Sequence, residues 1–440
     1  MPIINQITAR WILDSRGNPT VSCKVGVLHR DALYFGKSSV PSGASTGKYE
    51  AVELRDNGPE FGGKGVNQAV ENILNIIAKE IIGKDFHSAK DLDKHILELE
   101  KRLEDEIQEK VIQPKSVLGA NAVLGVSMAA HRAFAKAENL KLWEYLRQEY
   151  FTSLSSVTMP RLMCNIFNGG AHADNNIDIQ EFMIIPNSGV IETDVRMSAE
   201  IYHTLKKVLE SEDQITAVGD EGGFAPNYKD TNEVLESIQK SIVGAGYSRI
   251  NCDLGLDCAA SEFLNKESGL YNLDGKEYTQ SALNDLYAEL NERFCLLSIE
   301  DGFDEDDILG WQMMTAKIGK KTLLIGDDLF VTNPERFKDV GLGNEIANGV
   351  LIKLNQIGSV LETCEMINLA HENDYITAIS HRSGETNDDF IADLAVACNS
   401  EFIKLGAPAR GERISKYNRL LQIHEYIENQ KASIEIVELG

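Results

Sequence analysis

The stretch Leu297-Ser298-Ile299-Glu300 is a short apolar run that ends in an ionisable residue, and this form is repeated along the second half of the chain. The other runs of this kind end at Asp257, Asp327, Lys353, His381 and Lys404. Consecutive run ends lie 23 to 43 residues apart, which is the length that a strand and a returning helix need. The pattern therefore predicts repeated βα units that build a parallel sheet or barrel.

The ionisable run ends indicate one common polar surface. In a TIM-type barrel the chemistry takes place at the C-terminal ends of the strands. A single strand that ends in a carboxylate is more often a loop cap, but six such ends in register predict a functional barrel mouth.

The first third of the chain has a different, α+β pattern. Residues 21–27 alternate between apolar and polar side chains, as in a strand with one buried face. Apolar residues recur at helical spacing over 66–77, and Gly83 is placed to end that helix. A second helical stretch, rich in Ala, Leu and Met, is predicted over about 121–146.

The segment 150–156 interrupts this helical pattern, and we place a domain boundary there. This predicts an N-terminal α+β capping domain over residues 1–150 and a barrel domain over residues 151–440.

The composition excludes several classes of protein. The 440 residues carry 43 Lys and Arg against 68 Asp and Glu, a formal charge of −25, which disfavours nucleic acid or an anionic membrane as the main partner. No apolar run approaches the 18 or so residues of a membrane span. Seven scattered cysteines without a CxxC pair indicate reduced thiols, and no signal peptide is visible, so we expect a cytoplasmic protein.

Three of the run ends, Asp257, Glu300 and Asp327, predict a metal site. Carboxylates from neighbouring strands would repel one another unless a cation neutralised them. Oxygen-only ligation that leaves room for substrate favours Mg²⁺, whereas zinc would require a His and Cys cluster. The alternative is that the three carboxylates are only surface caps or salt-bridge partners.

Two lysines, Lys353 and Lys404, are expected at the same mouth. Loss of solvation and nearby cations would lower the pKa of each lysine toward that of a useful base. The residues alone leave open that Lys353 is merely a counter-ion for the carboxylates. His381, Arg382 and Ser383 offer donors suited to phosphate oxygens, unless the arginine lies on a solvated loop.

Glycine-containing loops complete the predicted site. The first, 41–48 (PSGASTGK), is one residue too short for a nucleotide P-loop and lacks its Ser or Thr, so we expect Ser45 on a mobile lid instead. Glu221 lies among glycines, so we expect an exposed carboxylate on flexible backbone, which would serve as a general acid if Glu181 raised its pKa. The alternative for Glu221 is an ordinary turn glutamate.

A metal, a lysine base, a glutamate acid and an anion clamp together indicate one class of reaction. This is removal of a proton beside a carboxylate, followed by loss of a leaving group. Enolase-superfamily sites are an established example, with a Lys or His base beside one or two Mg²⁺.

The sequence resembles the enolase family over essentially its whole length. Ten motifs in order carry the resemblance: 14–20 (DSRGNPT), 41–47 (PSGASTG), 168–183 (NGGAHADNNIDIQEFM), 219–226 (GDEGGFAP), 256–263 (LDCAASEF), 298–301 (SIED), 326–333 (GDDLFVTN), 351–358 (LIKLNQIG), 380–386 (SHRSGET) and 406–410 (GAPAR).

The resemblance implies an α+β lid domain followed by an atypical (β/α)₈ barrel. It also implies Mg²⁺-dependent, reversible dehydration of 2-phosphoglycerate to phosphoenolpyruvate in glycolysis and gluconeogenesis. Lys353 would remove the C2 proton and Glu221 would protonate the departing C3 hydroxyl. The assembly implied is a homodimer or an octamer.

The site residues that the resemblance implies fall into three sets. The catalytic set is Glu221, Lys353, Glu181 and His172. The substrate set is Gln180, His172, Glu181, His381, Arg382, Ser383 and Lys404. The metal set is Asp257, Glu300 and Asp327 for a structural Mg²⁺, with Ser45 for a second Mg²⁺ that arrives with substrate.

Two departures from the family pattern, Leu405 and Gly411, bring the positioning of Lys404 and the stiffness of its loop into question. Two alternative functions fit the sequence less well. Another enolase-superfamily dehydratase acting on acid sugars would not explain Ser45, Glu221 and the phosphate clamp together. Binding of plasminogen or of an RNA-degradation complex, with surface display or secretion without a signal peptide, would be secondary to catalysis.

Overall fold

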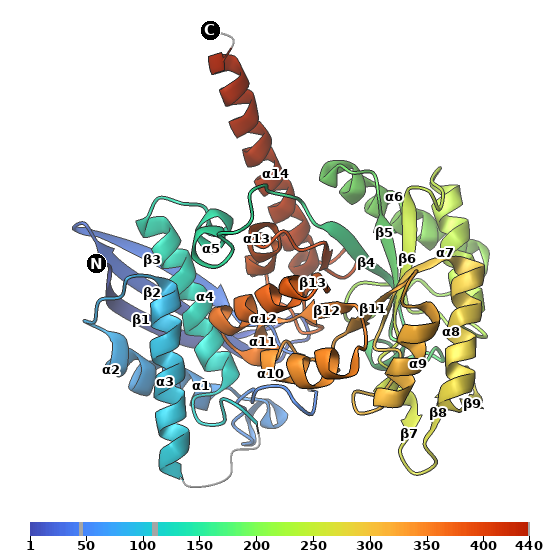
Figure 1. The fold of residues 1–440 in the computed structure, drawn as a ribbon, viewed down its shortest axis with the longest axis horizontal. Coiled ribbons are helices and arrows are strands. Elements are labelled where there is room, and N and C mark those ends of the chain that lie inside the picture. Colours follow the sequence, from blue (N-terminus) through green and yellow to red (C-terminus); the bar gives the residue numbers. More distant parts are fainter. Residues whose placement is uncertain (44–46, 108–112, 439–440) are drawn as a thin grey trace.

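The computed structural model describes the backbone of residues 1–43, 47–107 and 113–438, and the side chains of these residues up to position 430 except at position 107. Figure 1 shows an N-terminal region of sheet and helices beside a larger barrel, with the long helix α14 (Gly411–Glu438) extending away from both. The predicted fold class, an α+β region followed by a TIM-type barrel, is confirmed. Within the described residues, no helix is long and apolar enough to cross a membrane.

The N-terminal region is built on a three-stranded antiparallel sheet. Its strands, in spatial order, are β1 (Ile3–Leu13), β2 (Pro19–His29) and β3 (Ala32–Ser39). The apolar side chains of β2 that the sequence pattern pointed inward are fully buried, and helix α4 (Ala120–Ala137) packs against β2 and β3. The strand predicted over 21–27 is therefore confirmed.

Helices pack beside this sheet. They are the 3₁₀ turn Glu60–Gly63, α1 (Asn67–Asn72), a π-helical segment (Ile73–Ile77), α2 (Ala78–Ile81), α3 (Ala89–Ile107), α4 and α5 (Leu142–Tyr150). The predicted helix before Gly83 is present, with a π-helical turn inside it. The helix predicted over 121–146 is wrong in one respect, because it is two helices. Asn139 adopts a left-handed φ of 58° after α4, and Lys141 is the N-cap of α5, where its backbone N–H donates to Glu144 Oε2 at 2.8 Å.

The barrel is closed by eight strands. In spatial order these are β10 (Leu296–Glu300), β11 (Leu323–Gly326), β12 (Gly349–Ile352), β13 (Ile376–Ser380), β14 (Phe402–Lys404), β4 (Arg161–Asn168), β5 (Glu181–Pro186) and β6 (Cys252–Asp257). All six predicted apolar runs are barrel strands, and each ionisable residue lies at its strand end or directly after it.

Strand β5 departs from a regular barrel because it is antiparallel to both of its neighbours, β4 and β6. Its first residue, Glu181, pairs with Asp257, the last residue of β6. An antiparallel strand presents its N-terminal end where parallel strands present their C-terminal ends. Glu181 therefore reaches the same mouth as the other ionisable residues.

Side chains fill the barrel below the polar mouth. A compact apolar cluster consists of Met163, Met183, Ile185, Ile325, Leu351, Ala378 and Phe402, each at most 5% exposed. These residues come from six different barrel strands. The interior is thus a packed core, which gives the strand ends above it a rigid support.

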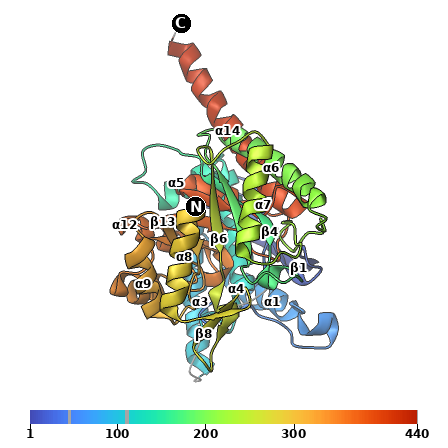
Figure 2. The same ribbon diagram turned by 90° about the vertical axis from the view of Figure 1, so that its right-hand side faces the viewer.

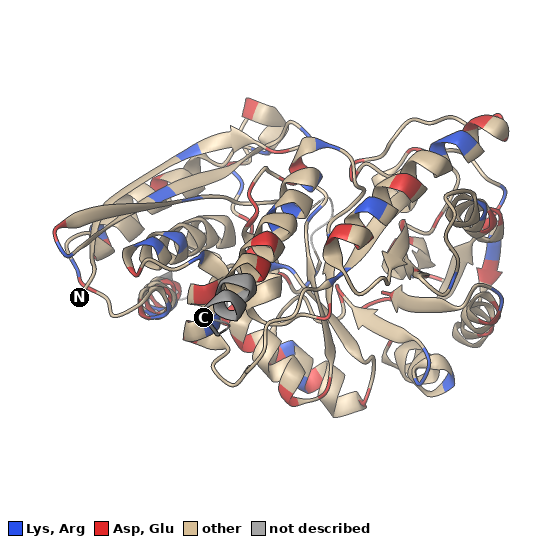
Figure 3. Ribbon diagram, turned by 90° about the horizontal axis from the view of Figure 1, so that it is seen from above, with Lys and Arg blue, Asp and Glu red and all other residues tan. Residues whose placement is uncertain are grey.

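Helices cover the outside of the barrel (Figure 1, Figure 2). They are α6 (Ile191–Ser211), α7 (Thr231–Gly244), α8 (Gln280–Phe294), α9 (Ile308–Ile318), α10 (Pro334–Arg336) with a π-helical turn (Phe337–Leu342), α11 (Leu354–Ile357), α12 (Val360–Glu372), α13 (Phe390–Ala397) and α14. Seen from above, their acidic and basic residues are interspersed (Figure 3).

Smaller elements follow β4 and β6. They are the 3₁₀ turns Gly170–His172 and Ala260–Phe263, and a small sheet of β7 (Leu264–Asn265), β8 (Leu270–Leu273) and β9 (Lys276–Tyr278). Residues 151–160, between α5 and β4, form no helix or strand. The domain boundary at residue 150 stays a prediction.

Candidate active site

A polar cavity lies at the mouth of the barrel. Eleven of the thirteen predicted site residues line it: His172, Gln180, Glu181, Glu221, Asp257, Asp327, Lys353, His381, Arg382, Ser383 and Lys404. Glu300 is fully buried beneath them and touches Lys404, while Ser45 lies outside the described residues. The structure therefore brings together every predicted site residue that it describes.

Lys404 is the buried cation at the centre of the mouth. Its Nζ donates to Asp257 Oδ2 at 2.9 Å and to both carboxylate oxygens of Glu300 at 2.9 and 3.0 Å, and it lies 3.2 Å from Glu181 Oε1. Burial lowers the pKa of Lys404, but these carboxylates outweigh burial and raise it well above its usual value. The predicted lowering of this pKa is wrong, because the prediction counted the nearby cations and not the carboxylates.

Lys353 follows β12 and forms an ion pair with Asp327. Burial, Arg382 and Lys404 lower the pKa of Lys353, but Asp327 raises it above its usual value. The predicted lowering is therefore wrong for this arrangement too, and the counter-ion role that the sequence left open is present. Asp327 also accepts a hydrogen bond at 2.8 Å from Gln356, a buried residue that the sequence reasoning missed.

The three predicted metal ligands come from adjacent strand ends of β6, β10 and β11. Asp257 and Glu300 share Lys404, whereas Asp327 pairs with Lys353. Burial and the charge of Asp257 raise the pKa of Glu300 well above its usual value, as expected for crowded carboxylates. An oxygen-only donor set balanced by two ammonium groups is chemically suited to a hard divalent cation such as Mg²⁺.

The compact acidic groups in the described residues differ from the predicted triad. Asp327 lies with Asp301 and Asp328 in a group whose oxygens are all within 4.8 Å of one another, and Asp257, Glu300 and Asp327 do not form such a group. Asp301 accepts hydrogen bonds from the backbone N–H groups of Asp327 at 2.9 Å and Asp328 at 2.8 Å. Asp301 thus fixes the loop that carries Asp327. Its position directly after Glu300 was the available sequence signal.

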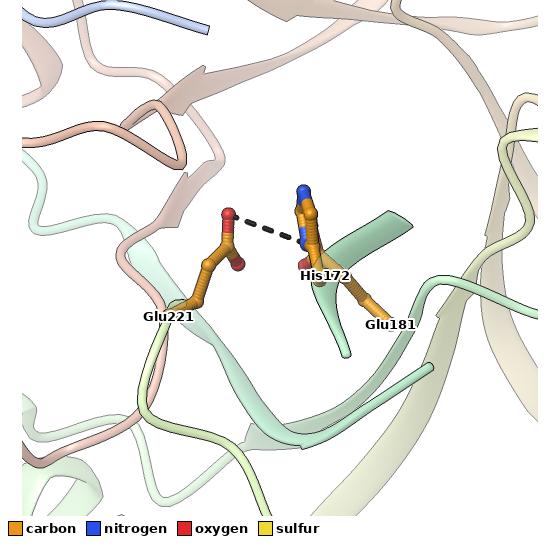
Figure 4. A group of neighbouring side chains, drawn as sticks. All are labelled: His172, Glu181 and Glu221. Carbon is orange, nitrogen blue, oxygen red and sulfur yellow. Dashed lines mark ion pairs between the residues drawn. The ribbon is translucent and has the colours of Figure 1, made fainter. Parts of the chain in front are cut away.

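His172, Glu181 and Glu221 form a second compact group (Figure 4). The Nδ1 atom of His172 lies 3.6 Å from Glu181 Oε1 and 3.7 Å from Glu221 Oε1. Each of the three side chains is buried, and they come from the turn after β4, the start of β5 and the loop 219–223. Two carboxylates on either side of one imidazole can hold and transfer a single proton.

The loop that carries Glu221 is firmly held, contrary to the prediction of an exposed carboxylate on flexible backbone. Glu221 is 2% exposed. The N–H of Gly219 donates to the carbonyl of Gly223 at 2.8 Å, Tyr202 donates to the carbonyl of Gly222 at 2.7 Å, and Ala407 donates to the carbonyl of Glu221 at 3.0 Å. The backbone of Glu221 is therefore held in one position.

The two carboxyl groups differ in proton affinity. Burial and the charge of Glu221 raise the pKa of Glu181 well above its usual value. Burial also raises the pKa of Glu221, but His381, His172 and Arg413 outweigh it and lower that pKa well below its usual value. The expectation of a raised pKa for Glu221 is therefore wrong, and the raised pKa of this pair belongs to Glu181.

The predicted phosphate clamp lies directly after β13. Arg382 is buried, and its guanidinium donates to both oxygens of Glu50 at 3.2 Å and to Asn355 Oδ1 at 3.1 Å. Ser383 follows it and is also buried. Glu50, which the sequence reasoning missed, lies just after the 41–47 motif, and this proximity was its only sequence signal.

The two departures from the family pattern are well accommodated. Leu405 is fully buried in the main core, and Lys404 beside it reaches its carboxylate partners. Gly411 is the first residue of α14, and a Cβ added there would meet only Asn387 Oδ1 at 3.9 Å. Neither departure displaces a predicted site residue.

Comparisons with known proteins show which family the chain is similar to. Residues 156–434 match the family model described as "Enolase, C-terminal TIM barrel domain", and residues 4–146 match "Enolase, N-terminal domain". A protein named Enolase from Elusimicrobium minutum is 47% identical over 434 residues, covering 98% of each chain. One of the same name from Corynebacterium kroppenstedtii is 47% identical over 430 residues, covering 97% of this chain and 96% of the relative.

Proposed function

The chain belongs to the enolase family, and we propose that Lys353 and Glu221 act as the base and the acid of that family's reaction. The protein is a lyase that dehydrates 2-phosphoglycerate in glycolysis. The proposal concerns how its residues share this chemistry, and it extends to the reverse reaction in gluconeogenesis.

The observation that supports the proposal is that Lys353 and Glu221 line one cavity. Lys353 follows β12, whereas Glu221 lies in one compact group with Glu181, which begins β5, four strands away in the closed order of eight. We therefore propose that the two groups act from opposite sides of the cavity. A substrate between them would lose its proton on one face and its hydroxyl on the other.

The reaction is proposed as two balanced steps. The neutral amine of Lys353 takes the C2 proton, and the electron pair of the C–H bond moves onto the substrate carboxylate. That pair then forms the C2–C3 double bond while the C3–O bond breaks. The leaving hydroxyl takes a proton from Glu221 and departs as water. Glu221 and Glu181 share this proton before the step.

The metal site is proposed on Asp257, Glu300 and Asp327, with Ser45 for a second ion. Mg²⁺ bound there would neutralise the carboxylates and stabilise negative charge on the substrate carboxylate. Asp327 is the main group that raises the pKa of Lys353. Once Asp327 is neutralised, burial, Arg382 and Lys404 remain, and all three lower the pKa of this lysine toward that of a base.

The remaining residues are proposed to bind substrate. Arg382 and Ser383 would hold the phosphate, with His381 beside them, and Lys404 would hold the carboxylate end. Gln180 and His172 would line the substrate. Arg382 would exchange its contact with Glu50 for the phosphate, since the Glu50 carboxylate and the phosphate are both anions that match the geometry of the Arg382 guanidinium.

The broader setting is also proposed. The resemblance to the family favours a homodimer, or an octamer built from dimers, in the cytoplasm. Binding of plasminogen or of an RNA-degradation complex, and display at the cell surface, would be secondary roles. The domain boundary at residue 150 belongs to this proposal as well.

The test separates the two chemical steps. Phosphoenolpyruvate formation should require Mg²⁺ and stop with a chelator. Lys353→Ala should abolish exchange of the C2 hydrogen with deuterium, whereas Glu221→Gln should retain exchange and lose dehydration by about 100-fold or more.

Exposed residues supply matched controls. Lys317→Ala and Glu236→Gln, which remove a lysine and a glutamate far from the mouth, should leave both rates unchanged. Turnover in chelator would contradict the metal role. Equal loss of exchange in the Lys353 and Glu221 variants would contradict the assignment of base and acid.

A further inference from the structure

Arg413 is a fully buried cation that no sequence motif singled out. It lies in the first turn of α14, and its guanidinium reaches two loops of the mouth. Nη1 approaches His381 Nδ1 at 2.6 Å and donates to the carbonyl of Arg382 at 2.5 Å. Nη2 donates to the carbonyls of Ser383 at 2.6 Å and Asp220 at 3.2 Å. One side chain therefore joins the phosphate loop to the loop of Glu221.

The contact with His381 fixes the position of a proton. A guanidinium has five N–H donors, stays protonated in proteins and cannot accept a hydrogen bond. The Nδ1 atom of His381 must therefore be the acceptor, and it carries no proton. Burial keeps the ring neutral, because it lowers the pKa of His381 to about 3. The single ring proton of His381 is then on Nε2.

That nitrogen lies beside the carboxylate of Glu221. His381 Nε2 is 3.3 Å from Glu221 Oε2, and Asn165 donates a hydrogen bond to the same oxygen at 2.9 Å. One hydrogen bond and one neighbouring N–H dipole therefore lie on the Oε2 side, which favours negative charge on that oxygen. The other oxygen, Oε1, lies 3.7 Å from His172 Nδ1, on the side that Glu181 shares.

We infer that Arg413 is a positioning residue, which fixes the Nε2–H tautomer of His381 and thereby selects Oε1 of Glu221 as the oxygen that transfers the proton. Arg413 does not touch the reacting atoms. It acts through His381, and the inference rests on the proposed role of Glu221 as the acid.

Close packing at Gly406 accommodates the contact between Arg413 and His381. Gly406 has a left-handed φ of 77°. A Cβ on Gly406 would lie 3.0 Å from Arg413 Cδ, 3.0 Å from His381 Cε1 and 2.9 Å from the carbonyl oxygen of Glu221. Arg413, His381 and Glu221 therefore converge on one glycine, and a side chain at this position would displace at least one of them.

A purely structural role is the competing explanation, and a neighbouring lysine makes it testable. Lys416, one turn further along α14, is also buried and donates to Glu385 Oε2 at 2.7 Å and to the carbonyl of Thr386 at 2.7 Å. Lys416 holds the same loop but does not contact His381. Lys416→Met is therefore a matched loss of a buried cation.

The first experiment measures the tautomer directly. Ring ¹⁵N chemical shifts of the Mg²⁺-loaded protein, with the His381 signals assigned from His381→Gln, distinguish protonated from unprotonated nitrogen. We expect a protonated Nε2 in the wild type and in Lys416→Met, and a mixture of tautomers in Arg413→Met. A proton on Nδ1 of His381 in the wild type would overturn the inference without any variant.

The second experiment measures the ratio of C2 hydrogen exchange to dehydration. Arg413→Met should raise this ratio about tenfold, because the proton transfer from Glu221 is slowed and the step at Lys353 is not. Arg413→Lys, of similar length and with a donor, should restore much of the wild-type ratio, and Lys416→Met should leave the ratio unchanged. Equal ratios in Arg413→Met and Arg413→Lys, or a rise in Lys416→Met, would overturn the inference.

The failure of the proposed function gives a different result. If Glu221 is not the acid, Glu221→Gln itself leaves the exchange-to-dehydration ratio at the wild-type value. If only the inference fails, Glu221→Gln raises the ratio and Arg413→Met does not. The tautomer measurement is independent of both.

Discussion

Gln356 connects three side chains in or beside the cavity with one amide group. Its Nε2 donates to Asp327 Oδ1 at 2.8 Å and lies 3.5 Å from Glu50 Oε1, while its Oε1 accepts a hydrogen bond from Thr332 at 2.8 Å. Thr332 in turn accepts the backbone N–H of Lys353 at 2.9 Å. The orientation of a proposed metal ligand and the backbone of the proposed base therefore depend on the same buried residue.

Gln356→Leu should weaken Mg²⁺ binding by about 10- to 100-fold, the usual effect of removing a hydrogen-bond partner of a metal ligand. Titration calorimetry of the metal-free protein with Mg²⁺ measures this directly. Gln312→Leu, at an exposed position on α9, is the control and should bind Mg²⁺ like the wild type. Unchanged affinity in Gln356→Leu would show that Asp327 does not need this amide.

The sequence could identify some of these residues and not others. Lys353 and Asp327 were predictable because each directly follows an apolar run that has to be a strand. Glu50 was not, because its partner Arg382 lies 332 residues away in the chain, and only the fold places the two together. Arg413 and Gln356 act through side-chain contacts of this kind. The direction of the pKa shifts was missed for a related reason, since it depends on which charges lie closest.

Two glycines near the start of α14 differ in what they require. Gly411 is exposed, and an added Cβ there has open space, whereas Gly406 has a φ of 77° and close contacts with the site. Gly411→Ala should stabilise the protein by about 0.4–1 kcal/mol, because it restricts the unfolded chain at no steric cost. Gly406→Ala should destabilise it by more than that. Thermal unfolding measures both changes in stability. A loss of stability in Gly411→Ala would contradict the open space found around this residue.

Helix α12 is held at its N-terminus by the N-terminal region. Asp93 on α3 accepts hydrogen bonds from the N–H of Leu361 at 3.1 Å and from Ser127 on α4 at 2.7 Å. Ser127 itself accepts the N–H of Val360 at 3.0 Å. Burial raises the pKa of Asp93 from 3.8 to about 7. The nearby negative charge of Glu362 also raises this pKa, and the positive charge of Lys115 lowers it. This contact joins the two regions of the chain through one titratable group.

The stability contributed by Asp93 should therefore depend on pH. Because the folded pKa lies above the unfolded one, this stability is fully present below about pH 4 and is lost as pH rises through about 7. The difference between these pKa values corresponds to about 4 kcal/mol at most. Asp93→Asn, which mimics the protonated form, should gain stability over the wild type between pH 5.5 and pH 8. Melting temperatures at these pH values measure the gain, and a constant difference would contradict the raised pKa.

At the level of strands and helices, periodicity located the elements but not their directions. The six apolar runs were found because buried strands exclude polar residues until the mouth is reached. The antiparallel direction of β5 was not predictable from its own residues, since parallel and antiparallel buried strands have the same kind of apolar run. The break between α4 and α5 was missed because Asn139 and Lys141 are compatible with a helix, and tertiary packing decided otherwise.

Because the whole molecule is strongly negative, we expect that its own cations are not sufficient to attract an anionic substrate. The chain carries a formal charge of −25. At the mouth, Lys353 is paired with Asp327, Arg382 with Glu50, and Lys404 with three carboxylates. The positive groups that would attract a phosphorylated acid are therefore already balanced by acidic side chains.

Binding of Mg²⁺ and binding of the product phosphoenolpyruvate should consequently be coupled. In chelator, phosphoenolpyruvate should leave the melting temperature unchanged, because every cation of the mouth has a carboxylate partner. Mg²⁺ alone, at about 100 times its dissociation constant, should stabilise the protein by about 2.7 kcal/mol. Mg²⁺ and phosphoenolpyruvate together should stabilise it further, because Mg²⁺ releases Lys353 and makes the mouth positive. Melting curves under the four conditions measure the coupling. The same rise with phosphoenolpyruvate in chelator as in Mg²⁺ would show that the protein's own cations are sufficient, and that the negative charge of the chain does not make the metal necessary.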